Sequence, residues 1–301
     1  MIVVCGEALM DMIGQSAHPG GGPFNTARAL ARLGVPTAFL GRLSTDALGH
    51  ELASRLGSDG VDLSMASSGP EPTTIAVADL DDSGNASYRF QVDGTSAPNF
   101  TTDMLPNQFP ATVQALQVGT LGLILEPMAS TIAQLVEREG SRLLVMVDPN
   151  VRTELVPAGN EYRRRLENVI AKSTIVKASE FDLAWLYPEM SYDAAADSLL
   201  QEPGVRLVVA TLGADGAFGA TSQARIHVET PKVDVVDTIG AGDAFGAGLL
   251  AWLHDRNKLD RHLRLESDEL EAALTFACMV AAITCTRAGA ETPWRAEVIG
   301  Y

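Results

Sequence analysis

The stretch Leu143-Leu144-Val145-Met146-Val147-Asp148-Pro149-Asn150 decides the fold class. Five apolar residues in a row, closed by Asp and Pro, are typical of a strand that is buried on both faces of a sheet. Helical spacing of apolar residues follows over Glu161–Ala171, and a second apolar run follows at Thr174–Val176. A strand, a helix and a strand in this order predict a βαβ unit, in which the two strands run parallel.

The same alternation continues outward in both directions along the chain. We expect further buried strands at Ile2–Cys5, Thr37–Leu40, Ala115–Val118 and Val205–Ala210, and further helices at Phe24–Leu33, Ala47–Leu56, Met128–Glu137, Asp193–Leu200, Gly240–His254 and Ser267–Thr284. Pro127 suits the first position of a helix, and Ser191 and Ser267 suit the N-cap position. The pattern predicts an α/β fold: a doubly wound, mostly parallel sheet with helices on both faces.

One insertion departs from this alternation. Thr73–Leu80 and Ala86–Val92 are rich in β-forming residues, and Asp81-Asp82-Ser83-Gly84-Asn85 between them has the composition of a hairpin turn. Because no helical pattern accompanies these strands, we expect a small β-sheet lid, formed mainly by residues 73–97 with residues 11–15 joining it. The chain shows no internal repeat and no long linker, so residues 1–301 are expected to form a single domain.

The composition limits the classes of function. The 301 residues carry 38 acidic and 22 basic side chains, a net charge of −16, which argues against binding DNA or RNA over a broad surface. Apolar residues make up 46% of the chain, yet no apolar run reaches the roughly 18 residues needed to span a bilayer. No basic segment precedes the first apolar run, so we expect no signal peptide and a cytoplasmic location. Cys5, Cys278 and Cys285 lack metal-type spacing and are expected to be reduced, buried thiols.

The segment Asp237-Thr238-Ile239-Gly240-Ala241-Gly242-Asp243 stands directly before a helical pattern and carries the strongest chemical signal. A Gly/Ala-rich turn at the start of a helix presents free N–H groups and the positive end of the helix dipole to an anion. A carboxylate beside that anion repels it, so Asp243 makes chemical sense as a base that removes a proton from an incoming hydroxyl. The same residues also fit a structural turn with an Asp helix cap.

The same glycines also echo a dinucleotide-binding fingerprint, which would make the protein an NAD(P)-linked oxidoreductase. That alternative requires a following strand that ends in an acidic or basic residue about 20 positions on. Here the helical pattern continues to His254 and a charged loop follows. The lysine-bearing phosphate loop of other nucleotide-binding proteins is absent, because none of the lysines follows a glycine.

Three further segments suit a sugar. Gly20-Gly21-Gly22-Pro23-Phe24-Asn25 enters a helix, where glycines allow close approach of a ligand and the Asn25 amide both donates and accepts hydrogen bonds. Asp11 follows the first strand and has acceptors for hydroxyl groups, and Arg152 follows the strand Leu143–Val147 at the edge where α/β sites lie. Each of these residues also has a purely structural alternative. Asn25 fits a helix cap after a flexible loop, Asp11 fits a solvated loop residue, and Arg152 fits a surface residue.

Together these segments resemble the ribokinase/PfkB family of sugar kinases over nearly the whole chain. Asp237–Asp243 with its small-residue helix matches one family signature, and Gly20–Asn25 followed by Ala29–Gly34 matches the other. The resemblance implies an ATP-dependent kinase with a β lid over the sugar. It implies Asp243 as the catalytic base, Gly240, Ala241 and Gly242 as the anion hole, Thr211, Gly213 and Gly216 as nucleotide-binding residues, and Asp11, Gly21 and Asn25 as sugar-binding residues. A non-catalytic sugar-binding protein on the same fold is the remaining alternative of another class.

One element departs from the family pattern. The family's Asn-x-x-Glu element, which helps to place magnesium and phosphate, corresponds to Ser179-Glu180-Phe181-Asp182. By resemblance we expect Ser179 near the nucleotide, Asp182 near Mg²⁺ through water, and a required Mg²⁺ that rides on substrate phosphates. The resemblance also leaves room for an activating monovalent cation such as K⁺ beside Arg287-Ala288-Gly289-Ala290, and for a homodimer formed through the lid.

The second strand of the expected lid, Ala86–Val92, distinguishes between possible substrates. Relatives that hold a sugar acid place an arginine two residues before the Gly-Thr pair, and that position here is Val92. Alternation along a strand puts Phe90 on the same face as Val92 and Arg89 on the opposite face, which suits a neutral sugar. We therefore expect Phe90 to contact the substrate and D-fructose to be converted to fructose 6-phosphate. A kinase for 2-keto-3-deoxygluconate, or for another sugar or a nucleoside, is the alternative within the family.

Overall fold

The main sheet confirms the expected α/β class. The computed structural model describes residues 1–14, 16–80 and 86–299. Within this part of the chain the largest sheet has the order β14-β13-β12-β11-β10-β9-β1-β4. Its strands are β1 (Ile2–Cys5), β4 (Thr37–Leu40), β9 (Ala115–Gly119), β10 (Leu144–Asp148), β11 (Ile175–Ser179), β12 (Leu207–Thr211), β13 (Ala217–Ala220) and β14 (Arg225–Val228). The strands from β12 to β4 are parallel, whereas β13 and β14 form an antiparallel edge that the apolar runs did not predict.

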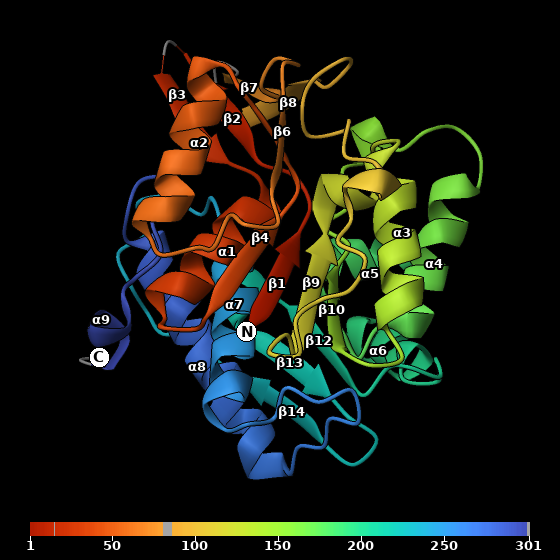
Figure 1. The fold of residues 1–301 in the computed structure, drawn as a ribbon. Coiled ribbons are helices and arrows are strands. Elements are labelled where there is room, and N and C mark those ends of the chain that lie inside the picture. The colour runs from red at the N-terminus through yellow and green to blue at the C-terminus, as the bar shows by residue number, and fades with distance from the viewer. Residues whose placement is uncertain (15, 81–85, 300–301) are drawn as a thin grey trace.

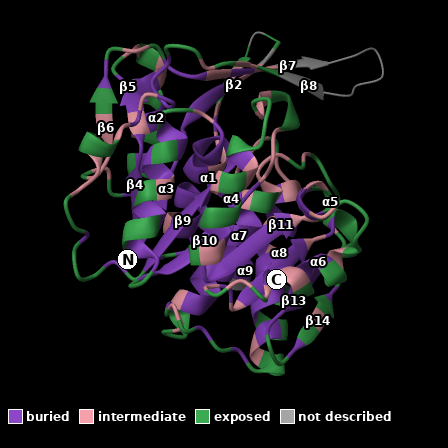
Figure 2. Cartoon of the chain, turned by 90° about the vertical axis from the view of Figure 1, so that its right-hand side faces the viewer, coloured by how far each residue is buried: buried purple, intermediate pink, exposed green. Residues whose placement is uncertain are grey.

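Helices cover both faces of this sheet (Figure 1). They are α1 (Gly22–Arg32), α2 (Ala47–Ser58), α3 (Met128–Glu139), α4 (Glu161–Lys172), α5 (Glu180–Leu186), α6 (Tyr192–Leu199), α7 (Ala241–Asp255), α8 (Ser267–Cys285) and α9 (Arg295–Ile299). Successive strand residues point to opposite faces, so Ile2 and Val4 pack with α1, α7 and α8, whereas Val3 and Cys5 pack with α3 and α4. Figure 2 shows these strands buried between helices whose outer surfaces are exposed.

A four-stranded sheet with the order β3-β2-β7-β8 lies beyond the carboxyl ends of the parallel strands (Figure 1). Its strands are β2 (Leu9–Ile13), β3 (Ser16–Gly20), β7 (Ile75–Leu80) and β8 (Ala86–Gln91). Strands β2 and β7 pair in parallel, which joins the N-terminal hairpin to the insertion. Strand β3 was not predicted from the sequence, and the predicted turn at residues 81–85 lies outside the described residues, as does residue 15. A third sheet pairs β5 (Arg42–Ser44) with β6 (Ser67–Gly69).

Three local predictions need correction. Ser267 is the first residue of α8 rather than its N-cap, because Glu266 occupies that position and forms a capping box with Glu269. Pro127 is the N-cap of α3, one residue before the expected position. Cys285 is only partly buried, whereas Cys5 and Cys278 are buried, and all three are free thiols.

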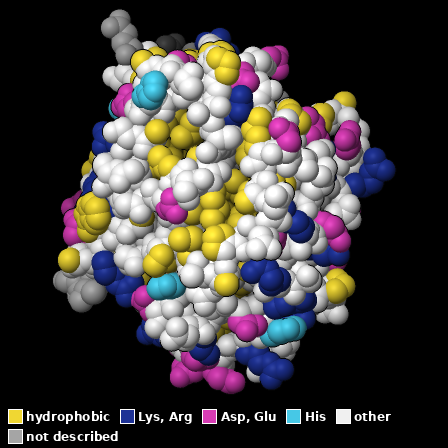
Figure 3. Space-filling model, viewed as in Figure 1, with side chains coloured by type: hydrophobic (Ala, Val, Ile, Leu, Met, Phe, Trp, Pro, Cys, Tyr) yellow, Lys and Arg dark blue, Asp and Glu magenta, His cyan; other side chains and the backbone are white. Residues whose placement is uncertain are grey.

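Charged side chains are spread over the surface. On the face shown in Figure 3, hydrophobic side chains gather in a band down the middle, and acidic and basic side chains lie mainly around it. No helix within the described residues has the length and apolar character to cross a bilayer.

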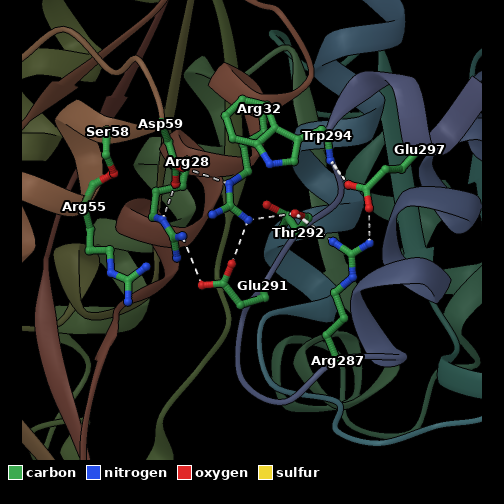
Figure 4. A network of polar contacts seen from close by, with 10 residues as sticks. All are labelled: Arg28, Arg32, Arg55, Ser58, Asp59, Arg287, Glu291, Thr292, Trp294 and Glu297. Carbon is green, nitrogen blue, oxygen red and sulfur yellow. Dashed lines mark hydrogen bonds and ion pairs between the residues drawn. The ribbon is translucent and has the colours of Figure 1, made fainter.

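A cluster of four charged residues, three of them buried, fastens the C-terminal segment to α1 (Figure 4). We call Arg28, Arg32, Asp59 and Glu291 the anchor cluster. Asp59 accepts from Arg28 Nε at 2.6 Å and lies 3.0 Å from Arg32 Nε. Glu291 contacts Arg28 at 3.1 Å and Arg32 at 2.8 Å, and the Arg32 guanidinium lies 5.3 Å from the centre of the Trp294 ring. The cluster holds residues 291–294 against the helix whose first turn reaches the cavity described next.

Candidate active site

A cavity of about 440 Å³ opens between the carboxyl ends of the parallel strands and the four-stranded sheet. Ligands of doubly wound sheets bind at this edge, because loops that leave neighbouring strands there diverge and leave a crevice. The sequence-predicted residues that line it are Asp11, Gly21, Asn25, Phe90, Arg152, Ser179, Asp182, Thr211, Gly213, Gly240, Gly242 and Asp243. Residues predicted from distant segments therefore meet at one place.

Two predicted residues do not line the cavity. Ala241 lies in the first turn of α7, between two glycines that do line it. Gly216 lies at the turn before β13, where an added β-carbon would collide with the carbonyl group of Val228. Close packing against β14 accounts for a glycine at position 216 without any ligand.

The N-terminus of α7 points into the cavity. Gly240 precedes the helix with φ +75°, a conformation that strains residues with a β-carbon. A β-carbon at Gly240 would also lie 2.5 Å from the β-carbon of Ala290, so the C-terminal segment packs directly on this turn. The first amides of α7 have no partners within the helix and, with the helix dipole, favour an anion at this end.

Asp243, in the first turn of α7, is the central acidic group. Its Oδ2 accepts a 2.9 Å hydrogen bond from Asn25 Nδ2, which links α7 to α1. Burial raises the pKa of Asp243 to about 7; the Asn25 amide opposes this rise and the Asp148 carboxylate adds to it. A carboxyl group that titrates near neutral pH is suited to accept a proton from a hydroxyl group. Asn25 Oδ1 is buried with no hydrogen-bond partner among the described residues.

Glu7, which follows β1, organises the loops around the cavity. Its Oε1 accepts from the Gly22 amide at 3.2 Å and from the Thr120 hydroxyl, and its Oε2 accepts from the Gly122 amide at 3.0 Å. Burial raises the pKa of Glu7, while these hydrogen bonds act in the opposite direction. Glu7 thus ties the start of α1 to the loop that follows β9.

The four-stranded sheet supplies one wall. Asp11 on β2 has a pKa raised to about 6 by burial and by the charge of Asp243, and the Arg152 guanidinium partly offsets this rise. Phe90 on β8 lines the same wall and packs against Leu9 and Leu121. Arg89 is exposed and does not line the cavity. The predicted alternation of side chains between the two faces of the strand does not reach Val92, because β8 ends at Gln91.

Ser179 and Asp182 form the capping box of α5. Asp182 Oδ2 accepts from the Ser179 amide at 2.8 Å and from its hydroxyl at 2.7 Å, while Oδ1 accepts from the Val151 amide at 2.7 Å. Both oxygens of the predicted metal-water ligand are therefore engaged in holding the backbone. Glu180, between them, is exposed and lines the cavity. Within the described residues, no cluster of three or more His, Cys, Asp and Glu side chains is arranged to hold a metal ion.

Several lining residues were missed by the sequence analysis. The most informative are Glu7, Thr120, Asn150 and Lys177. Glu7, Thr120 and Asn150 lie just after the carboxyl ends of parallel strands, a position that marks a residue in this fold as a site candidate, whereas Lys177 lies in the middle of β11.

Comparison with known proteins decides the family. Residues 2–297 match the pfkB family carbohydrate kinases. The chain belongs to this family. A fructokinase from Rhizobium leguminosarum bv. trifolii is 39% identical over 278 residues, covering 89% of this chain and 84% of that one.

Solved structures of two fructokinases share the fold over almost the whole chain. A fructokinase from Xylella fastidiosa with bound ATP has a TM-score of 0.90 at 26% identity, covering 99% of this chain and 97% of that one. A double mutant of a Vibrio cholerae O395 fructokinase, bound to fructose, ADP and a potassium ion, has a TM-score of 0.88 at 29% identity, covering 100% of this chain and 97% of that one. The pfkB family assignment and the ribokinase-like fold of the sequence analysis are both confirmed.

Proposed function

We propose that this carbohydrate kinase is a fructokinase, which transfers the γ-phosphate of ATP to the 6-hydroxyl of D-fructose. The observation that carries the proposal is Asp243, a buried carboxyl group with a pKa near 7 at the N-terminus of α7, in a cavity that also holds an anion-binding turn. The fructokinases among its relatives support the choice of sugar, because two of them bind fructose or ATP in structures of the same fold.

In this proposal Asp243 is the general base. It removes the proton of the sugar hydroxyl as that oxygen attacks the γ-phosphorus, and ADP departs as the bond to the β-phosphate oxygen breaks. The amides of Gly240, Ala241 and Gly242 stabilise the charge on the transferred group. Phosphoryl transfer depends on positioning and electrostatic stabilisation more than on covalent chemistry, and a helix N-terminus beside a base provides both.

The four-stranded sheet and α1 would hold the sugar. Asp11 and Asn25 Oδ1, which has no hydrogen-bond partner within the described part of the chain, offer acceptors to sugar hydroxyls, and Gly21 allows the sugar to approach the backbone. Phe90 covers the apolar side of the ring. Arg152 lies near Asp11 and completes this wall. The arrangement suits a neutral sugar, since Arg89 does not line the cavity.

Thr211, Gly213 and Ser179 would contact the nucleotide, because they line the cavity at the ends of β11 and β12. Mg²⁺ takes water and phosphate oxygens with only one or two carboxylates, and the exposed Glu180 carboxylate beside the nucleotide residues fits that need better than the engaged Asp182. Bound Mg²⁺ would neutralise charge on the phosphates. A monovalent cation beside Arg287–Ala290 is part of the proposal, supported by the potassium ion of the Vibrio cholerae O395 relative.

The test is a side-by-side measurement of kcat/KM with ATP and D-fructose, ribose, 2-keto-3-deoxygluconate and adenosine. Fructose should exceed each of the others by at least about tenfold, or roughly 1.4 kcal/mol. Phosphorus NMR of the product should show fructose 6-phosphate. A preference for the sugar acid would overturn the assignment of fructose and leave the kinase assignment in place. Binding of nicotinamide nucleotides without ATP consumption would overturn both.

A further inference from the structure

The cavity has a marked imbalance of charge. Among the described residues that line it, Glu7, Asp11, Glu180, Asp182 and Asp243 are acidic, and only Arg152 and Lys177 are basic. A γ-phosphate that enters this cavity needs positive charge close to the point of transfer, because acidic groups repel it.

Arg152 lies on the sugar side. It donates to the carbonyl and side-chain oxygens of Asn150, and its charge acts on Asp11 of the four-stranded sheet. Of the two basic residues, Lys177 is therefore the one placed to neutralise charge on the phosphate side of the cavity.

Lys177 lies beside the anion-binding turn. It is part of β11 and is 4% exposed, and its Nζ donates to Asp148 Oδ2 of the neighbouring strand β10 at 2.7 Å. A β-carbon added at Gly242 would lie 3.1 Å from this Nζ, so the ammonium group touches the first turn of α7, one residue from Asp243. A glycine at position 242 leaves this space open.

The Lys177–Asp148 pair leaves one of its polar atoms open towards a further partner. A buried ion pair adds stability only where its remaining polar atoms are also satisfied. Asp148 Oδ1 is buried and has no hydrogen-bond partner among the described residues. Burial alone would lower the pKa of Lys177, but the carboxylates of Asp148, Asp243 and Asp182 together outweigh that effect and raise the pKa, so the ammonium keeps its charge at the cavity wall.

We propose that Lys177, held in place by Asp148, is a further catalytic residue that contacts the transferred phosphoryl group. This inference rests on the proposed kinase function. Lys177 stabilises the oxygens of the phosphoryl group from the β11 side, while the amides of α7 do so from the other. It keeps its proton throughout: the new O–P bond forms at the sugar, the bond to ADP breaks, and the hydroxyl proton goes to Asp243.

The main variant is Lys177→Met, compared with Lys172→Met as the matched control. Lys172 is an exposed lysine at the end of α4 that pairs with Glu137, away from the cavity. We expect Lys177→Met to lower kcat by roughly 10²–10³, as the loss of one oxyanion-stabilising donor does, with the KM for fructose changed less than about threefold. The control should retain wild-type kcat.

Turnover per folded molecule separates catalysis from structure. The charge of Lys177 lowers the pKa of Asp243, so its removal should also move the acidic limb of the kcat/KM profile to higher pH. A lysine that only supported the fold would lower the amount of folded enzyme, measured by circular dichroism, and leave kcat per folded molecule near that of wild type at the pH optimum.

Because Lys177→Met leaves Asp148 as a buried unpaired carboxylate, the double variant Lys177→Met/Asp148→Asn provides a second test. It removes both charges, so it should fold with greater stability than the single variant while kcat stays low. A folded single or double variant with kcat within about fivefold of wild type would overturn the proposal. Wild-type enzyme that phosphorylates no sugar would instead refute the proposed function, so the two failures are distinguishable.

Discussion

Two clusters of charged residues lie near opposite ends of α1. The anchor cluster lies at the C-terminal half of the helix, and Asp148, Lys177 and Asp243, which we call the cavity cluster, lie near its first turns, where Asn25 contacts Asp243. In the anchor cluster two guanidinium groups face two carboxylates, and each carboxylate contacts both. In the cavity cluster Lys177 contacts Asp148 and acts on Asp243 only through its charge, so two carboxylates face one ammonium group. Each cluster leaves one buried polar atom without a hydrogen-bond partner among the described residues, Asp148 Oδ1 in the one and Arg32 Nε in the other.

This difference separates charges that stabilise the fold from charges that are placed to act on a ligand. Pairs in which each charge faces an opposite charge recover part of the cost of burial. The cavity cluster instead carries surplus negative charge. Burial raises the pKa of Asp243 to about 7, and the charges of Asp148 and Glu7 add to the rise. The ionised form of Asp243 therefore makes the native state less stable, which agrees with the role of general base proposed for it.

The largest effect should come from Asp243→Asn. The amide keeps the shape of the carboxyl group but accepts no proton, so kcat should fall by roughly 10²–10⁴ while the KM for fructose changes little. Steady-state kinetics measures both values. Asp268→Asn, an exposed residue in the first turn of α8, is the control. Near-normal turnover by Asp243→Asn would contradict the assignment of the base.

Substitutions in the anchor cluster should change the stability of the fold rather than the rate of the chemical step. Asp59→Asn leaves two buried guanidinium groups short of a partner, and we expect it to lower the free energy of unfolding by about 3–5 kcal/mol. Glu291 has a side chain that is 40% exposed, so solvent screens its contacts and Glu291→Gln should cost only about 1 kcal/mol. Urea denaturation of both variants tests the order. Equal losses would show that burial does not set the strength of these contacts.

The sequence predicted the layers of the fold because strands buried on both faces read as short apolar runs between helical patterns. It missed β13 and β14, where glycines and polar residues interrupt the apolar pattern. The strand predicted at Thr174–Val176 shows most clearly the limit of predicting strands from apolar runs. The apolar run ends before Lys177, yet β11 continues to Ser179 because Asp148 on the neighbouring strand compensates the lysine charge.

The candidate site could be predicted where one continuous segment carries the chemistry, as in Asp237–Asp243 and Gly20–Asn25. Glu7 and Lys177 act through partners far away in sequence, Thr120 for the first and Asp148 for the second. Pairing across strands and loops is a property of the folded chain, and no local pattern reports it.

A smaller effect is expected in the pH dependence of stability. The pKa of Asp243 is about 7 in the folded protein and about 3.9 in an unfolded chain, so the folded protein binds more protons between these values. The contribution of Asp243 to stability is therefore fully present below about pH 4 and is lost as the pH rises through 7. Asparagine resembles the protonated carboxyl group, so Asp243→Asn should gain about 1–3 kcal/mol over wild type at pH 8 relative to pH 5. Thermal unfolding at the two pH values measures this gain, and a difference that is independent of pH would contradict it.

The smallest effect should come from the monovalent cation, beside the C-terminal segment that the anchor cluster holds. Asp237 Oδ2 accepts from the Gly289 amide at 2.8 Å, and Ala290 packs on Gly240, so residues 287–290 support the anion-binding turn. Main-chain carbonyl oxygens of the anion-binding turn and of residues 287–290 suit K⁺. The bound ion would stiffen the turn, which the neighbouring Glu291 already helps to hold. Activation by K⁺ over tetramethylammonium, at constant ionic strength and saturating Mg²⁺, should therefore be modest, about 2–10-fold in kcat, or roughly 0.4–1.4 kcal/mol. In Glu291→Gln, where the segment is held less firmly, the activation should grow. Equal rates in K⁺, Na⁺ and tetramethylammonium would remove the cation from the proposal, and a response that Glu291→Gln leaves unchanged would show that the anchor cluster acts on the fold alone.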